Sequence, residues 1–261
     1  MIINTIKGGL GNQMFQWACG RNLSIKYKMP VYLDTSYYKI SNSNRNFELF
    51  EFPHLKYIDI DKLDTLPDYS TINEPPNFEF RDFPTEMNSN FRLEGYWQTE
   101  KFFIDIKELI IEEFSMTDET KKRLVSKYHE IGKDSVSIHV RRTDYVSSNG
   151  FHPLQNIEYY IEGLSIIKNY KNIFIFSDDI DWCKKNFNFK NSFFVEGNSN
   201  VEDLWLMTLC NHNIIANSSF SWWGAYLNMK SDRKVIYPKN WFGNFTGINT
   251  SLICPNNWIK I

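Results

Sequence analysis

Three features that would each indicate a class of protein are missing from this sequence. No apolar run approaches the length of a membrane-spanning helix, which argues against an integral membrane protein of the helical type. The net charge is only −2, with basic and acidic residues interspersed, so no broad field attracts nucleic acid or anionic lipid. The four cysteines form no CxxC pair and do not cluster with histidines, which disfavours a zinc site and a disulfide framework. Any anion-binding site must therefore be local.

The start of the chain and the scattered thiols indicate a compartment. Residues 1–6 lack the charged, apolar and small-residue segments of a signal peptide, and the cysteines are interpreted as reduced. We therefore expect a cytoplasmic protein. Peripheral contact with the inner membrane face stays open as an alternative, although no basic amphipathic helix indicates it.

A glycine-rich loop stands near the N-terminus. A β-branched strand at 2–6 precedes Gly8, Gly9 and Gly11, and an apolar-periodic helix is predicted from 14 to 27. Glycines let a backbone approach a ligand closely, and a helix start offers unpaired N–H groups. The spacing fits neither a P-loop nor a dinucleotide fingerprint. Asn12 and Gln13 are instead placed to donate hydrogen bonds to a substrate.

The second half of the chain alternates strands with helices. Strands are predicted at 135–140, 172–177, 213–217 and 234–238, with helices at 156–169, 204–209 and 218–227. This alternation is typical of a parallel, doubly wound α/β sheet with right-handed crossovers. At 261 residues the chain is long enough for two lobes, and we place them at 1–130 and 131–261.

Each strand of this half ends in polar side chains. His139, Arg141 and Arg142 end the first, Asp178 and Asp179 the second, and Ser218 and Ser219 the third. Ligands of open α/β sheets bind outside the carboxyl ends of the strands. Arginine forks and a helix start with hydroxyl groups suit a diphosphate, and a carboxylate suits the paired N–H donors of guanine. The pattern predicts a guanine nucleotide site, although adjacent arginines also occur as a solvated edge with surface ion pairs.

Four motifs give the sequence a resemblance to a known family. They lie at 8–16, 95–103, 139–145 and 217–225, in this order over nearly the whole chain. Together they resemble the motifs of the bacterial-type α-1,2-fucosyltransferases of glycosyltransferase family 11. The resemblance implies a GT-B-like fold of two Rossmann-like lobes. It also implies transfer of L-fucose from GDP-β-L-fucose to the 2-hydroxyl of a terminal galactose, with inversion and without a metal or other cofactor.

The resemblance also implies roles for individual residues. Arg141 would bind the β-phosphate, His139 would lie against the nucleoside, and Asp203 would pair with guanine. The phosphate site would be completed by Ser219 and the Phe220 backbone. Further site residues that we expect are Gly9, Gly11, Asn12 facing donor and acceptor, Arg142, Ser218, Asp178 at the ribose or in a structural role, and Asp144 as general base, with Glu100 and His152 as further candidates.

Two other functions are consistent with parts of the sequence. Asp179-Ile180-Asp181 is a DxD tripeptide after a strand, as in metal-dependent GT-A transferases, although a second such tripeptide stands at 59–61. The aromatic content of 16% would suit a non-catalytic carbohydrate-binding protein, which leaves the arginines and the serine-rich helix start unexplained.

Overall fold

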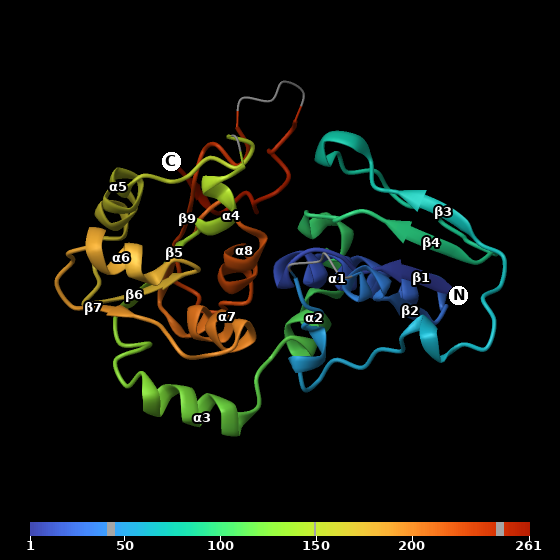
Figure 1. Ribbon diagram of the computed structural model, residues 1–261, viewed down its shortest axis with the longest axis horizontal. Helices are drawn as coiled ribbons and strands as arrows, with labels where there is room; N and C mark the ends of the chain where they lie inside the picture. Colours follow the sequence, from blue (N-terminus) through green and yellow to red (C-terminus); the bar gives the residue numbers. More distant parts are fainter. Residues whose placement is uncertain (41–44, 149, 244–247) are drawn as a thin grey trace. The chain divides into compact units, whose positions relative to one another are not determined.

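The computed structural model describes residues 1–40, 45–148, 150–243 and 248–261 and divides the chain into two compact units. Unit 1 comprises Met1–Ser115 with Asn249–Ile253, and unit 2 comprises Met116–Ile248 with Cys254–Ile261. In Figure 1, Met1–Ser115 of unit 1 is coloured from blue to green, whereas residues 249–253 of the same unit are red. Each unit has its own parallel sheet and is described here by itself.

Unit 1 is built on a parallel sheet with the strand order β2-β1-β4-β3. Strand β1 (Ile2–Thr5) is almost fully buried, and helix α1 (Leu10–Tyr27) packs on it. The helix starts earlier than periodicity predicts, because Gly9 is its N-cap. The other elements of this unit are β2 (Val31–Asp34), β3 (Ser70–Asn73), β4 (Phe91–Glu94), α2 (Lys107–Glu113) and the short 3-10 helices η1 (Ser36–Lys39), η2 (Leu49–Glu51), η3 (Ile60–Lys62), η4 (Pro76–Phe78), η5 (Glu100–Phe102) and η6 (Ile104–Ile106).

Unit 2 contains the longer parallel sheet, with the strand order β10-β9-β8-β5-β6-β7. Its central strand β5 (Ser135–Val140) is buried along its whole length, as expected for a strand covered by helices on both faces. The other strands are β6 (Asn172–Ser177), β7 (Ser192–Phe194), β8 (His212–Ile214), β9 (Val235–Tyr237) and β10 (Ile259–Lys260). The helices are α3 (Asp118–Lys127), α4 (Thr143–Val146), α5 (Ile157–Ile167), α6 (Ile180–Asn186), α7 (Asn200–Leu209) and α8 (Ser219–Tyr226).

The two faces of strand β5 pack against different helices. Val136, Ile138 and Val140 belong to the hydrophobic core that α5 and α6 complete. His139 contacts Phe220 at the start of α8, with ring centroids 5.5 Å apart. Figure 1 shows α5 with α6 and α7 with α8 as two pairs flanking this sheet. Because side chains alternate along a strand, residues that follow β5 continue toward one face or the other.

The division into units comes earlier in the chain than the expected boundary at residue 130. Helix α3 lies beyond Ser115 and belongs to unit 2. Its side chains explain why: Arg123 forms an ion pair with Glu202 of α7, and Lys127 donates to the backbone oxygen of Glu196. Sequence periodicity finds such a helix, but it cannot tell on which side of a boundary the helix packs.

The four cysteines, Cys19, Cys183, Cys210 and Cys254, are all buried and unbonded to one another, as the sequence predicts. Within the described ranges, no helix combines the length and the apolar character needed to cross a membrane.

Candidate functional site

The two neighbouring arginines after β5 point to different surroundings. The Arg141 guanidinium forms ion pairs with Asp144, at 2.8 Å, and with Asp178, at 3.2 Å, and stands 5.6 Å from the ring centre of Tyr145. Burial lowers its pKa, but the two carboxylates outweigh burial and raise the pKa above the ordinary value. Arg141 is therefore a fixed positive charge at the carboxyl end of the central strand, with a side chain only 16% exposed.

Arg142 follows the face of Val140 toward α6. Its guanidinium lies 3.8 Å from the ring centre of Trp182 and 3.1 Å from Asp179. It also lines a cavity of about 300 Å³ together with residues that include Gln155. We expected both arginines at the nucleotide site. The structure separates them by the strand alternation, and only Arg141 lies with the His139 side.

Asp178 and Asp179, which end strand β6, bind other parts of the protein. The Asp178 carboxylate accepts the Arg142 backbone N–H at 2.9 Å and the Thr143 hydroxyl, in addition to the Arg141 ion pair. Asp179 caps α6 by accepting the Trp182 backbone N–H at 3.2 Å. Asp178 thus holds the turn that carries Arg141, and both Asp179 oxygens already have protein partners.

His139 presents a buried nitrogen to the same strand end. The residue is 4% exposed, and its Nδ1 has no hydrogen-bond partner among the described residues. Burial lowers the pKa of His139 to about 3, so the imidazole is neutral at physiological pH. An unpartnered buried nitrogen costs free energy unless a ligand or water satisfies it. His139 therefore marks a position where a bound group can supply the missing hydrogen bond.

The β8–α8 link brings its hydroxyl groups to this end of the sheet. Ser218 is the N-cap of α8 and is buried, and Ser219 is the first helical residue. Two contacts that the sequence did not indicate hold the link: the Tyr145 hydroxyl donates to the Asn217 carbonyl at 2.7 Å, and Gln155 donates to the Asn217 side chain at 3.1 Å. The start of α8 is thus fixed by one residue of α4 and one of the loop before α5.

Asp203 stands in the first turn of α7. Its Oδ1 accepts a hydrogen bond from Asn198 Nδ2 at 2.8 Å. Burial, with a smaller contribution from Glu202, raises the pKa of Asp203 to about 6, although Asn198 and Lys127 act in the opposite direction. The helix begins with a capping box in which Ser199 and Glu202 exchange hydrogen bonds. A carboxylate of this kind is available to a ligand with N–H donors.

The glycine loop of unit 1 is shaped by one residue with positive φ. Gly8 has φ +82°, and a Cβ there would lie 2.8 Å from the Asn12 amide nitrogen, so only glycine fits. Asn12 Oδ1 accepts a hydrogen bond from Gln98 at 2.8 Å. Gln13 is fully buried and bonds Gly8, Asn46 and Glu48, so it holds the loop and does not face a substrate, which corrects our expectation for this residue.

The candidate bases differ in their surroundings. Asp144 is about half exposed and ion-paired with Arg141. His152 is stacked on Tyr145, with ring centroids 4.5 Å apart and an interplanar angle of 11°, and its Nδ1 has no partner among the described residues. Burial lowers the pKa of His152. Glu100 lies in η5 of unit 1. The structure thus places Asp144 and His152 in the unit that carries Arg141.

A model of a known family, described as glycosyl transferase family 11, matches residues 4–261. The chain belongs to glycosyltransferase family 11. It is therefore a glycosyltransferase, and the non-catalytic alternative is not retained.

Two curated relatives match this family 11 enzyme over nearly its whole length, and a third matches part of it. It is 32% identical to an alpha-1,2-colitosyltransferase of Escherichia coli, over 100% of this chain and 99% of that protein. It is 29% identical to the O-antigen biosynthesis glycosyltransferase WbnK of Escherichia coli, over 98% and 99%. A galactoside 2-alpha-L-fucosyltransferase, SEC1 of Bos taurus, is 26% identical over 60% of this chain and 46% of that protein.

Two solved structures share the fold of the family 11 enzyme. NodZ alpha-1,6-fucosyltransferase, soaked with GDP-fucose, matches 87% of this chain and 91% of its own with a TM-score of 0.54 at 14% identity. POFUT1 in complex with GDP matches 90% and 97% with a TM-score of 0.56 at 11% identity. The expected GT-B-like α/β fold with parallel sheets is confirmed.

Proposed function

We propose that this glycosyltransferase moves L-fucose from GDP-β-L-fucose to the 2-hydroxyl of a terminal galactose, forming an α-1,2 linkage with inversion. The observation that carries the proposal is Arg141, a buried, fixed cation at the carboxyl end of β5 beside the unpartnered Nδ1 of His139. The donor follows from the chemistry of these groups together with the GDP-fucose and GDP named for the two structural relatives. The α-1,2 linkage follows the names of the curated relatives.

Arg141 would bind the β-phosphate and stabilise the leaving group. Breakage of the bond between fucose and the diphosphate leaves negative charge on the phosphate and positive character on the sugar. A guanidinium has five N–H donors, and the described ion pairs of Arg141 reach only Asp144 and Asp178. The two carboxylates therefore preorganise the fork while donors remain for a phosphate. Preorganised donors aimed at a developing charge are among the largest contributions to catalysis.

The other donor contacts would come from β5, the start of α8 and α7. His139 would offer its buried nitrogen to the nucleoside, and Ser218, Ser219 and the Phe220 backbone would receive phosphate oxygens at the start of α8. Asp203 would accept the paired N–H donors of guanine. Asp178, already bound by Arg141 and Thr143, acts in this proposal by positioning Arg141.

The acceptor side of the reaction has fewer assigned groups. Asp144 would take the proton from the galactose hydroxyl, and Asn12, with Gly9 and Gly11 in the glycine loop, would contact donor and acceptor. The acceptor would be a free oligosaccharide or a lipid-linked O-antigen precursor, since both can end in galactose. A peripheral site of action at the inner membrane face belongs to the second case.

A second donor is favoured by one specific observation, the 32% identity to an alpha-1,2-colitosyltransferase. Colitose is the 3-deoxy counterpart of L-fucose, so a colitosyl nucleotide would make the same phosphate and base contacts. The two donors would be distinguished by contacts to a single sugar hydroxyl. A direct comparison of their kcat/KM values decides between them.

We also propose that the reaction needs no metal. The rival DxD site of Asp179 and Asp181 is disfavoured because both Asp179 oxygens already bind Trp182 and Arg142. In the described part of the chain, no group of three or more acidic, histidine or cysteine side chains is arranged to hold a metal ion.

The test is release of GDP from GDP-fucose in excess chelator, with and without lactose, followed by mass spectrometry and linkage analysis. We expect lactose-dependent turnover and a 2-linked fucosyl product. Turnover that stops with chelator and returns with Mn²⁺ would overturn metal independence. Turnover only with a colitosyl nucleotide would show that the donor sugar is colitose and not fucose. The absence of any GDP binding would overturn the nucleotide site proposed around Arg141.

A further inference from the structure

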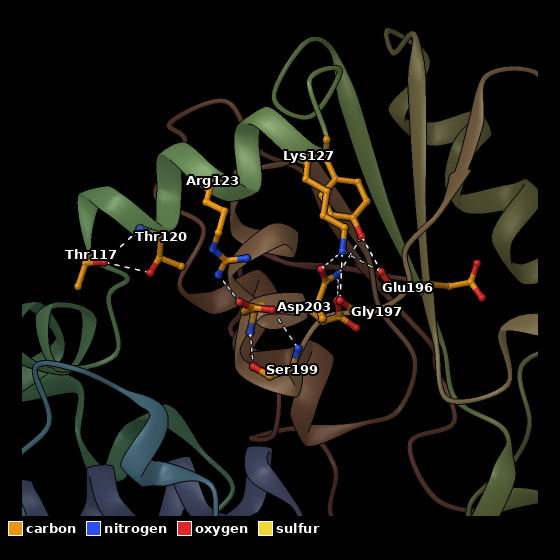
Figure 2. A network of polar contacts seen from close by, with 11 residues as sticks. Thr117, Thr120, Arg123, Lys127, Glu196, Gly197, Ser199 and Asp203 are labelled. Carbon is orange, nitrogen blue, oxygen red and sulfur yellow. Dashed lines mark hydrogen bonds and ion pairs between the residues drawn. The ribbon is translucent and has the colours of Figure 1, made fainter.

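The Asp203 carboxylate is held by a side chain that the sequence did not single out. Asn198 lies before the capping residue of α7 and donates from Nδ2 to Asp203 Oδ1, at 2.8 Å, and to the Tyr128 hydroxyl, at 2.9 Å. Its own Oδ1 accepts from Lys127 Nζ at 2.6 Å. Figure 2 shows this network between α3 and the start of α7. All these residues belong to unit 2.

The chemistry of the neighbours fixes the orientation of the Asn198 amide. A lysine can only donate, so the amide oxygen must face Lys127. The Tyr128 hydroxyl donates its single proton to the Glu196 carbonyl at 3.0 Å, so it must accept from Asn198. An amide rotated by 180° would lose these bonds and turn its oxygen toward the Asp203 carboxylate. The nitrogen therefore faces Asp203.

Lys127 also ties the preceding loop to the end of α3. Its ammonium group donates to the carbonyls of Glu196 and Gly197, each at 3.1 Å. Gly197 has φ +70°, which lets the chain turn directly before Asn198. The loop, the amide and the carboxylate thus form one connected arrangement.

The second oxygen of Asp203 accepts no hydrogen bond from the described residues. One oxygen is thus bound to the protein and the other is available, on a side chain that is neither fully buried nor fully exposed. The second oxygen is therefore open to a ligand with N–H donors.

We propose that Asn198 is a positioning residue for base selection, which holds Asp203 so that its carboxylate meets the paired N–H donors of guanine. This rests on the role given to Asp203 in the proposed function. Asn198 does not touch the nucleotide. It fixes the rotamer of Asp203 and, by hydrogen bonding to the charged form, favours the ionised carboxylate that a purine with two donors requires.

The test compares the affinities of GDP and inosine diphosphate, which lacks the exocyclic amino group, by titration calorimetry of the full chain. The unsubstituted protein should prefer GDP by about tenfold or more, as one hydrogen bond to a charged acceptor provides. Asp203→Asn should abolish the preference. Asn198→Ala should weaken GDP binding about tenfold while changing inosine diphosphate binding much less. Asn186→Ala, an exposed asparagine of α6, should change neither.

A pH series adds a readout that a merely structural residue would not move. The GDP preference of the unsubstituted protein should fall as pH drops below about 6, where Asp203 takes up a proton. In Asn198→Ala this midpoint should shift to higher pH, because the hydrogen bond that stabilises the charged form is gone.

The outcomes separate this inference from the proposed function. A preference that Asp203→Asn removes but Asn198→Ala keeps, with an unchanged midpoint, would overturn the role of Asn198 alone. Equal binding of the two nucleotides to the unsubstituted protein would overturn the Asp203 assignment and this inference with it. If Asn198→Ala does not fold, Lys127→Met at the surface replaces it as the test, because it removes the donor that orients Asn198. The preference for GDP over inosine diphosphate should then decline, and an unchanged preference would count against the proposal.

Discussion

The arginine pair after β5 shows how strand alternation divides two like side chains. Alternation along a strand places His139 and Arg141 on one side and Val140 and Arg142 on the other, and Arg142 lies against Trp182 accordingly. The sequence could not show that Asp144 and Asp178 would hold Arg141, because Asp178 comes from another strand. The alternation of side chains along β5 separates the two arginines, whereas one of the two carboxylates that hold Arg141 comes from another strand.

Arg141→Lys should lower kcat nearly as much as Arg141→Ala, by roughly a hundredfold or more, which corresponds to about 3 kcal/mol. A lysine keeps the charge but cannot bind Asp144, Asp178 and a phosphate with one planar fork. Steady-state kinetics with circular dichroism measures this, and Arg21→Lys in the ion pair with Glu113 of unit 1 is the matched control. Near-normal turnover of a folded Arg141→Lys would remove Arg141 from the site.

His139 should make the folded protein less stable as the solution becomes acidic. Its pKa is about 3 in the folded state and about 6.5 when unfolded, so below pH 6.5 the unfolded chain binds a proton that the folded chain does not. The free energy of unfolding should therefore fall by about 1.4 kcal/mol per pH unit from this group, or about 2 kcal/mol at pH 5.

Urea unfolding between pH 7.5 and 5 gives the free energy of unfolding as a function of pH. The contribution of His139 is the difference between the slopes of this function for the unsubstituted protein and for His139→Asn. Asn186→Ala, which removes an exposed side chain that does not titrate, provides the control and should keep the original slope. Parallel curves for the original protein and His139→Asn would mean that His139 takes up its proton over the same pH range in the folded and the unfolded state.

At the scale of elements, the sequence predicts those that carry a strong period or cap. The buried runs of β5 and β6 and helix α5, which is predicted at 156–169 and is capped by Asn156, appear as expected. Strand β3 was missed because it is polar and mostly exposed, and its place depends on pairing with β4. Strands β7 and β10 and helix α6 are short and have little pattern of their own. They exist because the larger sheet offers them an edge or a face.

The hydrogen-bond network around Asn198 could not be predicted from sequence patterns either. Lys127 and Asn198 are 71 positions apart, on a helix and a turn whose proximity only the folded unit creates. The resemblance to family 11 pointed to Asp203, but nothing in the order of residues named the amide that orients it. Sequence motifs thus indicate residues that contact a ligand, whereas the residues that orient them are found only from the packing of the folded unit.

At the scale of the molecule, the last residues return to unit 2 after Asn249–Ile253 join unit 1. Strand β10 pairs with β9, and Trp258 is buried with its ring 5.5 Å from that of Trp222. Trp258→Ala should cost about 3–5 kcal/mol of unfolding free energy, as for other large buried side chains. We expect hydrogen exchange to accelerate by roughly a hundredfold or more in β8 and β9.

Peptide-resolved exchange measures this in both units at once. Amides of β1 in unit 1 should exchange as before, because β10 extends only the sheet of unit 2. Lys260→Ala, which removes an exposed side chain from the same strand, is the control and should change neither unit. Equal acceleration in β1 and β9 would show that the two units unfold as one, and the C-terminal strand would then stabilise the whole enzyme and not the sheet of unit 2 alone.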